Sequence, residues 1–120
     1  MRLWTIRTEQ LAALQGIYEQ RLVDRAVKYV RRQHPRACAS LAESAIRASV
    51  ETALGKREAF RFDSEETVLA WLDLMYLLGF GFDDDPRCAW ARERLADFTL
   101  GARTRLLLTV EDARERAGQR

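Results

Sequence analysis

Apolar residues recur at steps of three and four along the first third of the chain, between about Glu9 and Gln33. This period gathers side chains on one face of an α-helix. We therefore predict a long amphipathic helix that has Thr8 as its N-cap and ends before Pro35. Gly16 in its interior is expected to allow close contact with a neighbouring helix. The predicted apolar face consists of Leu11, Leu14, Tyr18, Leu22, Ala26, Tyr29 and Val30, broadened by Ile17, Val23 and Val27.

Start signals predict two more helices in the middle of the chain. Ser40 and Glu43 have the spacing of a capping box, which predicts that the second helix starts at Ser40. The segment Asp63–Glu66 offers an N-cap candidate followed by acidic residues, which the helix dipole favours in a first turn. The helix that follows, at about 64–78, is apolar nearly all round and ends at Gly79. We predict that it is the central and most buried helix.

The rest of the chain predicts two further helices. Asp85 is the N-cap candidate of the first and Pro86 its first residue, where a missing amide hydrogen costs no hydrogen bond. The second begins near Thr99 and runs into a charged tail that we expect to fray from about residue 112. No segment alternates with period two for long, so no sheet is predicted. The predicted fold is all-α, a single-domain bundle of about five helices over residues 1–120.

Composition agrees with one folded domain and excludes a disordered chain. The 120 residues are 48% apolar and 32% charged, with only 2 Pro and 6 Gly. The net charge of +2 hides an uneven distribution, because residues 1–36 carry 8 Lys or Arg against 3 acids and residues 63–100 carry 3 against 9. Two interpretations fit this asymmetry. Oppositely charged helices pack side by side, or the charges form an interaction surface.

A basic stripe on the first helix sharpens this question. Its members follow one another at steps of four, three and four residues, so they lie on one face of the helix. The stripe has three interpretations: it binds phosphates of a nucleic acid, meets an acidic protein partner, or pairs with the acids of residues 63–100. The near-neutral total charge and the lack of a helix-turn-helix signature weigh against nucleic acid. The stripe consists of Arg21, Arg25, Lys28 and Arg32.

The chain offers little chemistry for catalysis or for a metal. One His and two Cys, Cys38 and Cys88, do not have the spacing of a zinc site. The run Asp83–Asp85 lacks the alternation of a calcium-binding loop, so helix capping and charge pairing are expected there. His34 and Cys38 are close in sequence, but no third residue completes a catalytic group. We therefore expect no catalytic, cofactor-binding or metal site, and no enzyme.

Asp73 is the one acid inside the apolar helix, and a buried carboxylate needs a hydrogen-bond donor or a proton. We expect it to pair with an Arg of the first helix. The aromatic residues around this helix are expected in the core, although the Phe residues of the turn after Gly79 would anchor a partner if exposed. These aromatic residues are Trp71, Tyr76, Phe80, Phe82 and Trp90.

Compartment and assembly follow from weaker signals. Met1–Trp4 does not open a secretory signal, and the most apolar stretch, Val68–Phe82, is shorter than the roughly 20 residues of a membrane span. We expect a cytoplasmic protein that has reduced thiols and no membrane segment. The small-residue face around Ala45, Ala48 and Ala53 packs either within the domain or between two copies of the chain.

Several short motifs occur together along the chain. In this combination the sequence resembles a family of small bacterial proteins encoded beside the spike, PAAR and effector genes of type VI secretion systems. The residues that carry the resemblance are Ile6-Arg7, Glu9-Gln10, Arg32-Gln33-His34-Pro35, Cys38, Leu41, Leu72-Asp73-Leu74-Met75-Tyr76, Gly79, Phe82-Asp83-Asp84-Asp85-Pro86, Trp90-Ala91 and Leu95-Ala96-Asp97.

The resemblance implies a cytoplasmic helper, an adaptor or chaperone that binds a type VI effector or spike component. An immunity-type protein that binds a toxin is the first alternative, and a nucleic-acid-binding helical module is the second. We predict that the partner contacts the basic stripe and the aromatic, acidic turn. The predicted partner-binding residues are Arg21, Arg25, Lys28, Arg32, Phe80, Phe82, Asp83, Asp84, Asp85 and Trp90.

Overall fold

The computed structural model describes the backbone of residues 8–118 and the side chains of residues 13–118. Throughout this range the regular structure is helical, without a strand, which confirms the predicted all-α fold. Expectations on Met1–Trp4, on Ile6-Arg7 and on the side chains of Thr8 and Leu11 lie outside the described residues. The elements are α1 (Thr8–Gln33), α2 (Pro35–Ala39), α3 (Glu43–Gly55), α4 (Arg57–Phe60), α5 (Glu65–Leu78), α6 (Ala89–Leu95) and α7 (Ala102–Gly118), with 3-10 turns η1 (Phe82–Asp84) and η2 (Pro86–Cys88).

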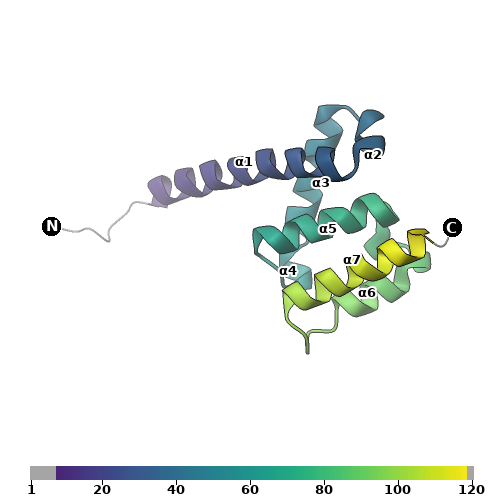
Figure 1. Cartoon of the computed structure of the whole chain (residues 1–120). Coiled ribbons are helices and arrows are strands. Elements are labelled where there is room, and N and C mark those ends of the chain that lie inside the picture. Colours follow the sequence, from purple (N-terminus) through teal and green to yellow (C-terminus); the bar gives the residue numbers. More distant parts are fainter. Residues whose placement is uncertain (1–7, 119–120) are drawn as a thin grey trace.

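Helix α5 is the centre of the bundle, as predicted for residues 64–78. It lies between α1 and α7 in Figure 1 and contacts α1, α3 and α7. An unbroken run of buried residues from Ala70 to Met75 shows that this helix is covered on nearly all sides. Its apolar character is therefore explained by burial within the domain.

An aromatic cluster closes one side of α5. Trp71 is 1% exposed, and its ring centroid lies 4.8 Å from that of Phe60, 5.3 Å from that of Phe62 and 5.0 Å from that of Phe82. These contacts join α4 and the turn η1 to the central helix. The expectation of an aromatic core is confirmed for Trp71 and Phe82.

The predicted helix signals have two outcomes. Ser64 caps α5, because its hydroxyl accepts a hydrogen bond from the Thr67 amide, and Gly79 ends the helix with φ 119°. Asp85 caps η2 through the Arg87 amide. The capping box at Ser40 was wrong. The short helix α2 takes up this segment, and Ser40 ends it by donating to the carbonyl of Ala37, so α3 starts only at Glu43.

The N-terminal half of α1 projects from the bundle (Figure 1). Among the described side chains of α1, which start at residue 13, burial begins at Leu22, whereas Leu14, Ile17 and Tyr18 are 58%, 52% and 62% exposed. The prediction of one continuous core face was therefore wrong for these three residues, because the helices that cover α1 reach only its C-terminal half. Gly16 lies in the same exposed half, with no atom within 4 Å of where a Cβ would stand. No helix of the described range makes the close contact expected there.

The helix count also differs from the prediction of about five. The additional elements are short. Helices α2 and α4 and the turn η1 lie in segments that we expected to be connectors. The turn η2 instead replaces the start of the helix that we predicted from Pro86, so α6 starts only at Ala89. At the other end α7 stays helical to Gly118, beyond residue 112 where we expected fraying. Ala113 is buried and Asp112 forms an ion pair with Arg94 of α6, so this part of α7 packs against the bundle.

Arg105 of α7 holds two connections together from inside the protein, the one between α4 and α5 and the one between α6 and α7. Its side chain is 3% exposed, and its guanidinium donates to the carbonyls of Phe60, Arg61, Leu95 and Leu100 at 2.7–3.0 Å. Phe60, Arg61 and Leu95 lie at the C-terminal ends of α4 and α6, where a helix leaves carbonyls without partners, and Leu100 lies in the connection that leads to α7. Burial lowers the pKa of the Arg105 guanidinium.

Candidate functional site

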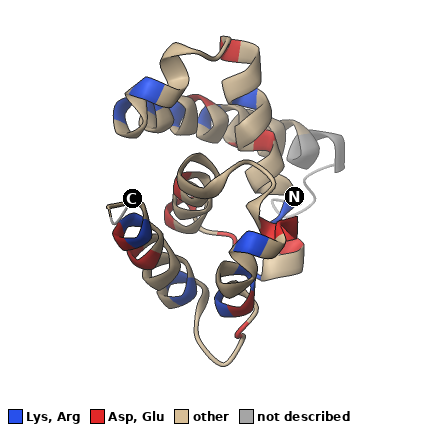
Figure 2. Ribbon diagram, turned by 90° about the vertical axis from the view of Figure 1, so that its right-hand side faces the viewer, with Lys and Arg blue, Asp and Glu red and all other residues tan. Residues whose placement is uncertain are grey.

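The basic stripe of α1 lies on the surface. All four of its members are exposed, and Lys and Arg recur turn after turn along α1 in Figure 2. The stripe continues toward the N-terminus, since Tyr18 precedes Arg21 by three residues and Leu14 precedes Tyr18 by four. Residues at these steps share one helix face. Exposed apolar and exposed basic side chains therefore form a single face, which we call the α1 face: Leu14, Ile17, Tyr18, Arg21, Arg25, Lys28 and Arg32.

Internal pairing uses one of the four stripe residues. The guanidinium of Arg25 lies 2.5 Å from Glu65 Oε1 of α5, and this contact raises the pKa of Arg25. Within the described part of the chain, Arg21, Lys28 and Arg32 form no ion pair. The expectation that the stripe pairs with the acids of residues 63–100 holds for Arg25 alone.

Four acids of that segment are instead paired with other basic residues. Glu66 pairs with Arg103 at 2.7 Å, Asp84 with Arg92 at 3.2 Å, and Asp85 with Arg87 at 2.9 Å. Asp83 is bound by Lys56 at 2.6 Å. The charge asymmetry of the sequence therefore leaves a positive surface on α1.

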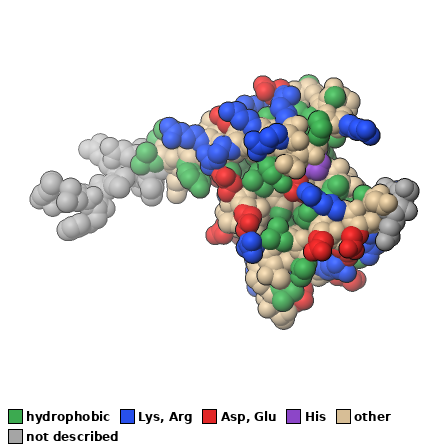
Figure 3. All heavy atoms as spheres, in the orientation of Figure 1, with side chains coloured by type: hydrophobic (Ala, Val, Ile, Leu, Met, Phe, Trp, Pro, Cys, Tyr) green, Lys and Arg blue, Asp and Glu red, His purple; other side chains and the backbone are tan. Residues whose placement is uncertain are grey.

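A groove runs beside the α1 face. Two hollows of about 230 and 370 Å³ adjoin each other, because Tyr29, Glu65 and Leu69 line both. The first is bordered by the basic residues of α1, and the second reaches Leu107 on α7. In Figure 3 basic side chains gather along α1, apolar ones lie in the recess beneath it, and the single histidine lies near the C-terminal end of α1. The groove thus has a basic wall and a partly apolar floor.

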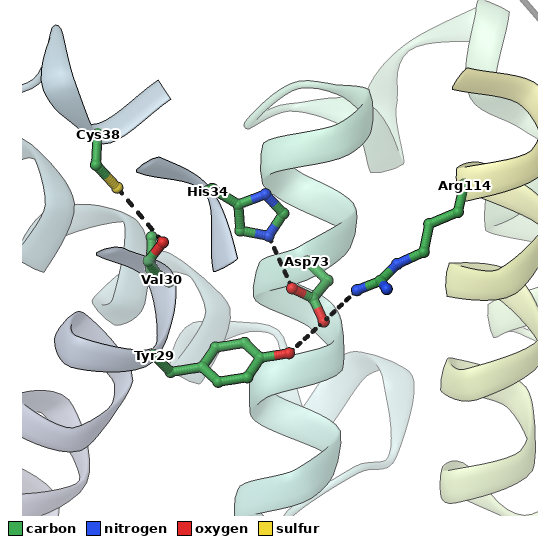
Figure 4. A network of polar contacts seen from close by, with 6 residues as sticks. All are labelled: Tyr29, Val30, His34, Cys38, Asp73 and Arg114. Carbon is green, nitrogen blue, oxygen red and sulfur yellow. Dashed lines mark hydrogen bonds and ion pairs between the residues drawn. The ribbon is translucent and has the colours of Figure 1, made fainter. Parts of the chain in front are cut away.

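A polar network lies at the end of this groove, where three segments converge on Asp73 (Figure 4). Tyr29 donates to Asp73 Oδ2 at 2.7 Å, and His34 Nε2 lies 2.8 Å from Oδ1. A guanidinium nitrogen of Arg114 lies 3.7 Å from Oδ2. The expected Arg from the first helix was wrong. Helix α1 supplies a tyrosine instead, and the arginine comes from α7.

Burial and the hydrogen bond to Asp73 raise the pKa of Tyr29 to about 12. The phenol therefore stays protonated at neutral pH and remains a donor. Asp73 is almost fully buried, and its contacts join α1, the α1–α2 junction and α7 to the central helix. The network supports the fold and fixes the shape of the groove.

His34 and Cys38 do not form a catalytic pair. His34 is turned toward Asp73 and stacks on Tyr76, with ring centroids 5.2 Å apart. Cys38 is buried, its thiol points at the carbonyl of Val30 at 3.6 Å, and burial raises its pKa. A raised pKa reduces the thiolate fraction that nucleophilic chemistry requires.

The aromatic, acidic turn is mainly structural. Phe82 is 1% exposed in the core, so the prediction that it contacts a partner was wrong. Asp83 is buried against Lys56, and Asp84 binds Arg92, which also donates to the carbonyl of Asp83. Phe80 is 41% exposed and remains available on the surface. The turn buries its apolar anchor because that anchor completes the cluster around Trp71.

Asp85 and Trp90 lie close together, away from the groove beside α1. They line a separate hollow of about 250 Å³ with Arg87 and Arg116. The Arg116 guanidinium stacks 3.9 Å from the Trp90 ring centroid, so the indole is partly covered within the domain. Hydrogen bonds from the side chain and backbone of Arg87 lower the pKa of Asp85. The predicted partner-binding residues therefore lie in two separate places, on the α1 face and in the segment from Phe80 to Trp90.

Several residues of the groove were not predicted from the sequence. Tyr29 and Leu69 were assigned to the core, and Leu107 to the last helix without a role, yet all three line the groove. A signal was present in the pattern of α1, where Tyr18 and Tyr29 border the basic stripe. Tyr and Arg on one face are typical of protein interfaces.

The described residues contain neither a cluster of metal ligands nor a membrane-spanning helix. No group of three or more His, Cys, Asp or Glu side chains there is arranged to hold a metal ion. Among the helices of the described range, none has both the length and the apolar character that crossing a membrane requires.

Comparison with known proteins gives no relative from which to transfer a role. No protein-family model, no curated protein and no solved structure matches the chain.

Proposed function

We propose that this chain is a non-enzymatic protein-binding accessory of bacterial type VI secretion, an adaptor or chaperone that binds an effector or spike protein in the cytoplasm. The observation that carries protein binding is the α1 face. There three large apolar residues, Leu14, Ile17 and Tyr18, are each more than half exposed on a helix that projects from the bundle. The secretion context is supported by the sequence resemblance.

The exposed apolar side chains of the α1 face favour protein binding because their contact with water is unfavourable. Each square ångström of apolar surface removed from water stabilises a complex by roughly 25 cal/mol, and large exposed apolar patches on soluble proteins mark interaction sites. Neighbouring arginines support the same use, since Arg and Tyr are enriched among the residues that dominate binding energy. The α1 face offers both kinds of residue along one helix.

Co-expression with the products of the adjacent genes tests this proposal. We expect one of them to co-purify as a complex that survives size-exclusion chromatography. The double variant Leu14→Ser/Tyr18→Ser should lose the complex while keeping the thermal unfolding temperature of the unchanged chain, because both side chains are exposed. If no neighbouring product binds, the proposed function fails.

The same complex separates the adaptor from the immunity alternative. An adaptor is required for export of its partner and gives no protection when the partner is produced inside cells. An immunity protein restores growth of cells that produce a toxic partner. Growth and export assays on the unchanged chain and the Leu14→Ser/Tyr18→Ser variant distinguish the two roles.

A further inference from the structure

The charges around the groove do not balance. Three acidic side chains line it. Glu65 and Glu66 are engaged by Arg25 and Arg103, and Asp73 by Tyr29, His34 and Arg114. Lys28 and Arg32 line the groove, and Arg21 lies on the same helix face one turn before Arg25. None of these three forms an ion pair within the described residues. An approaching molecule therefore meets three uncompensated positive charges along the α1 face, two of them at the groove, and these charges attract an acidic partner.

The apolar surface extends along the same line. Leu14, Ile17 and Tyr18 lie on the projecting half of α1, and Leu69 and Leu107 line the groove further on. From Leu14 to Arg32 the α1 face is roughly 27 Å long at 1.5 Å per residue. A partner helix of about 18 residues, or five turns, has the same length.

The form of the surface favours a rod-shaped protein element. Where the chain is described it has no strand, so no sheet edge is offered to an extended peptide, and a recess beside a helix accepts an amphipathic helix. Nucleic acid would place phosphates against exposed Leu14 and Ile17. A flat membrane would touch the ridge of α1 without reaching the recessed Leu69.

We propose that the groove between α1 and α7 binds an acidic amphipathic α-helix of the partner protein. Its apolar side chains pack on Tyr18, Leu69 and Leu107, and its carboxylates bind Arg21, Lys28 and Arg32. This inference rests on the proposed function and names the chemistry that the partner must present.

The experiment is a selection of displayed 18-residue peptides on the full chain, with counter-selection on the triple variant Arg21→Glu/Lys28→Glu/Arg32→Glu. Enriched peptides should be acidic, with apolar residues at three- and four-residue steps. A synthesised peptide should become helical on binding, and its affinity should fall with added salt. Enrichment of neutral or basic peptides, or of none, would overturn the proposal.

Variants test the contacts directly. The triple variant should bind the acidic peptide at least about tenfold more weakly, which corresponds to ~1.4 kcal/mol. The matched control Arg87→Glu changes an exposed arginine that pairs within its own turn, and it should leave binding unchanged. A peptide with its acids replaced by lysine should bind the triple variant and not the unchanged chain. Without this charge-swap rescue the specific ion pairs are refuted.

Two further probes separate the other macromolecules. A 20-base-pair DNA duplex and vesicles containing phosphatidylserine should bind more weakly than the selected peptide at the same ionic strength. Stronger binding of either would overturn the helix proposal. The two proposals also fail differently. A neighbouring protein that binds equally well to the triple variant refutes the acidic helix alone, whereas peptide binding without any protein partner refutes the accessory role alone.

Discussion

His34 and Asp73 face each other across the junction of α1 and α5, with the imidazole Nε2 2.8 Å from the carboxylate Oδ1. The same carboxylate accepts from Tyr29 and lies 3.7 Å from Arg114. One buried acid therefore joins three segments that are distant in sequence. The position of α1 relative to the bundle, and with it the shape of the groove, depends on this junction.

Replacing Asp73 with Asn should lower the free energy of unfolding by about 1–3 kcal/mol, because Tyr29, His34 and Arg114 lose a charged acceptor. Urea unfolding followed by tryptophan fluorescence measures the loss. Asp63→Asn is the matched control, since Asp63 is exposed at the start of the same helix, and it should stay within about 0.5 kcal/mol of the unchanged chain. Equal stability of the two variants would contradict a structural role for the network.

Tyr29 should make stability depend on alkaline pH. Its pKa rises from 10.0 to about 12 on folding, mainly through burial and then through the hydrogen bond to Asp73. The folded protein then holds the phenolic proton more tightly, so this contribution is complete below pH 10 and is lost as the pH rises toward 12. Unfolding curves between these pH values should show the decline.

The variant Tyr29→Phe serves as the control for that titration. It lacks the group that ionises, so its stability should fall less steeply over the same interval. In an alkaline absorbance titration, the variant should also lack the tyrosinate signal that Tyr29 contributes near pH 12 in the unchanged chain. Identical curves for the two proteins would show that Tyr29 does not cause the decline.

Arg105 should be among the most sensitive positions. Arg105→Ala removes the donor for four backbone carbonyls and should cost at least about 3 kcal/mol, since hydrogen bonds to charged groups contribute about 1.5–3 kcal/mol each. Calorimetry should show a lower unfolding temperature. Arg103→Ala, which removes an exposed residue of the same helix, should change stability little. A small effect of Arg105→Ala would refute the structural role of this residue.

Alanine at Gly16 should stabilise the projecting half of α1 by about 0.5–1 kcal/mol, because glycine loses more backbone freedom in a helix and no neighbour opposes a Cβ there. Slower amide hydrogen exchange around residues 13–20 measures the gain. Gly79→Ala has the opposite expectation. At φ 119° an alanine is strained, and stability should fall by about 1–3 kcal/mol.

Local signals predicted the central helix well. Ser64, the acids that follow it and Gly79 act within one or two turns of the chain, so they set the limits of α5 without reference to the rest of the protein. The prediction at Ser40 was wrong because it considered only these local signals. A capping box competes with any nearby arrangement, and the turn after Pro35 formed α2 instead.

Local signals could not predict the tertiary contacts, that is, which element covers which residue. The period of α1 indicates an apolar face, but whether Leu14 meets a core depends on how far α3 and α5 extend beside it. The sequence predicts that buried Asp73 needs a hydrogen-bond donor, but it does not predict that Tyr29 and Arg114 are its partners. Likewise Phe82 is buried because its ring packs against Trp71 of α5. Each outcome depends on contacts between residues far apart in sequence.

The projecting half of α1 links folding to recognition. Isolated helical turns are marginal in water, so this half gains stability from whatever covers it. By mass action, a bound partner protects these turns, and a change that strengthens the helix tightens the complex by at most the same free energy. Under the proposed function, Gly16 therefore influences affinity through the stability of the helix itself, and its replacement by alanine would lengthen the residence time of the complex.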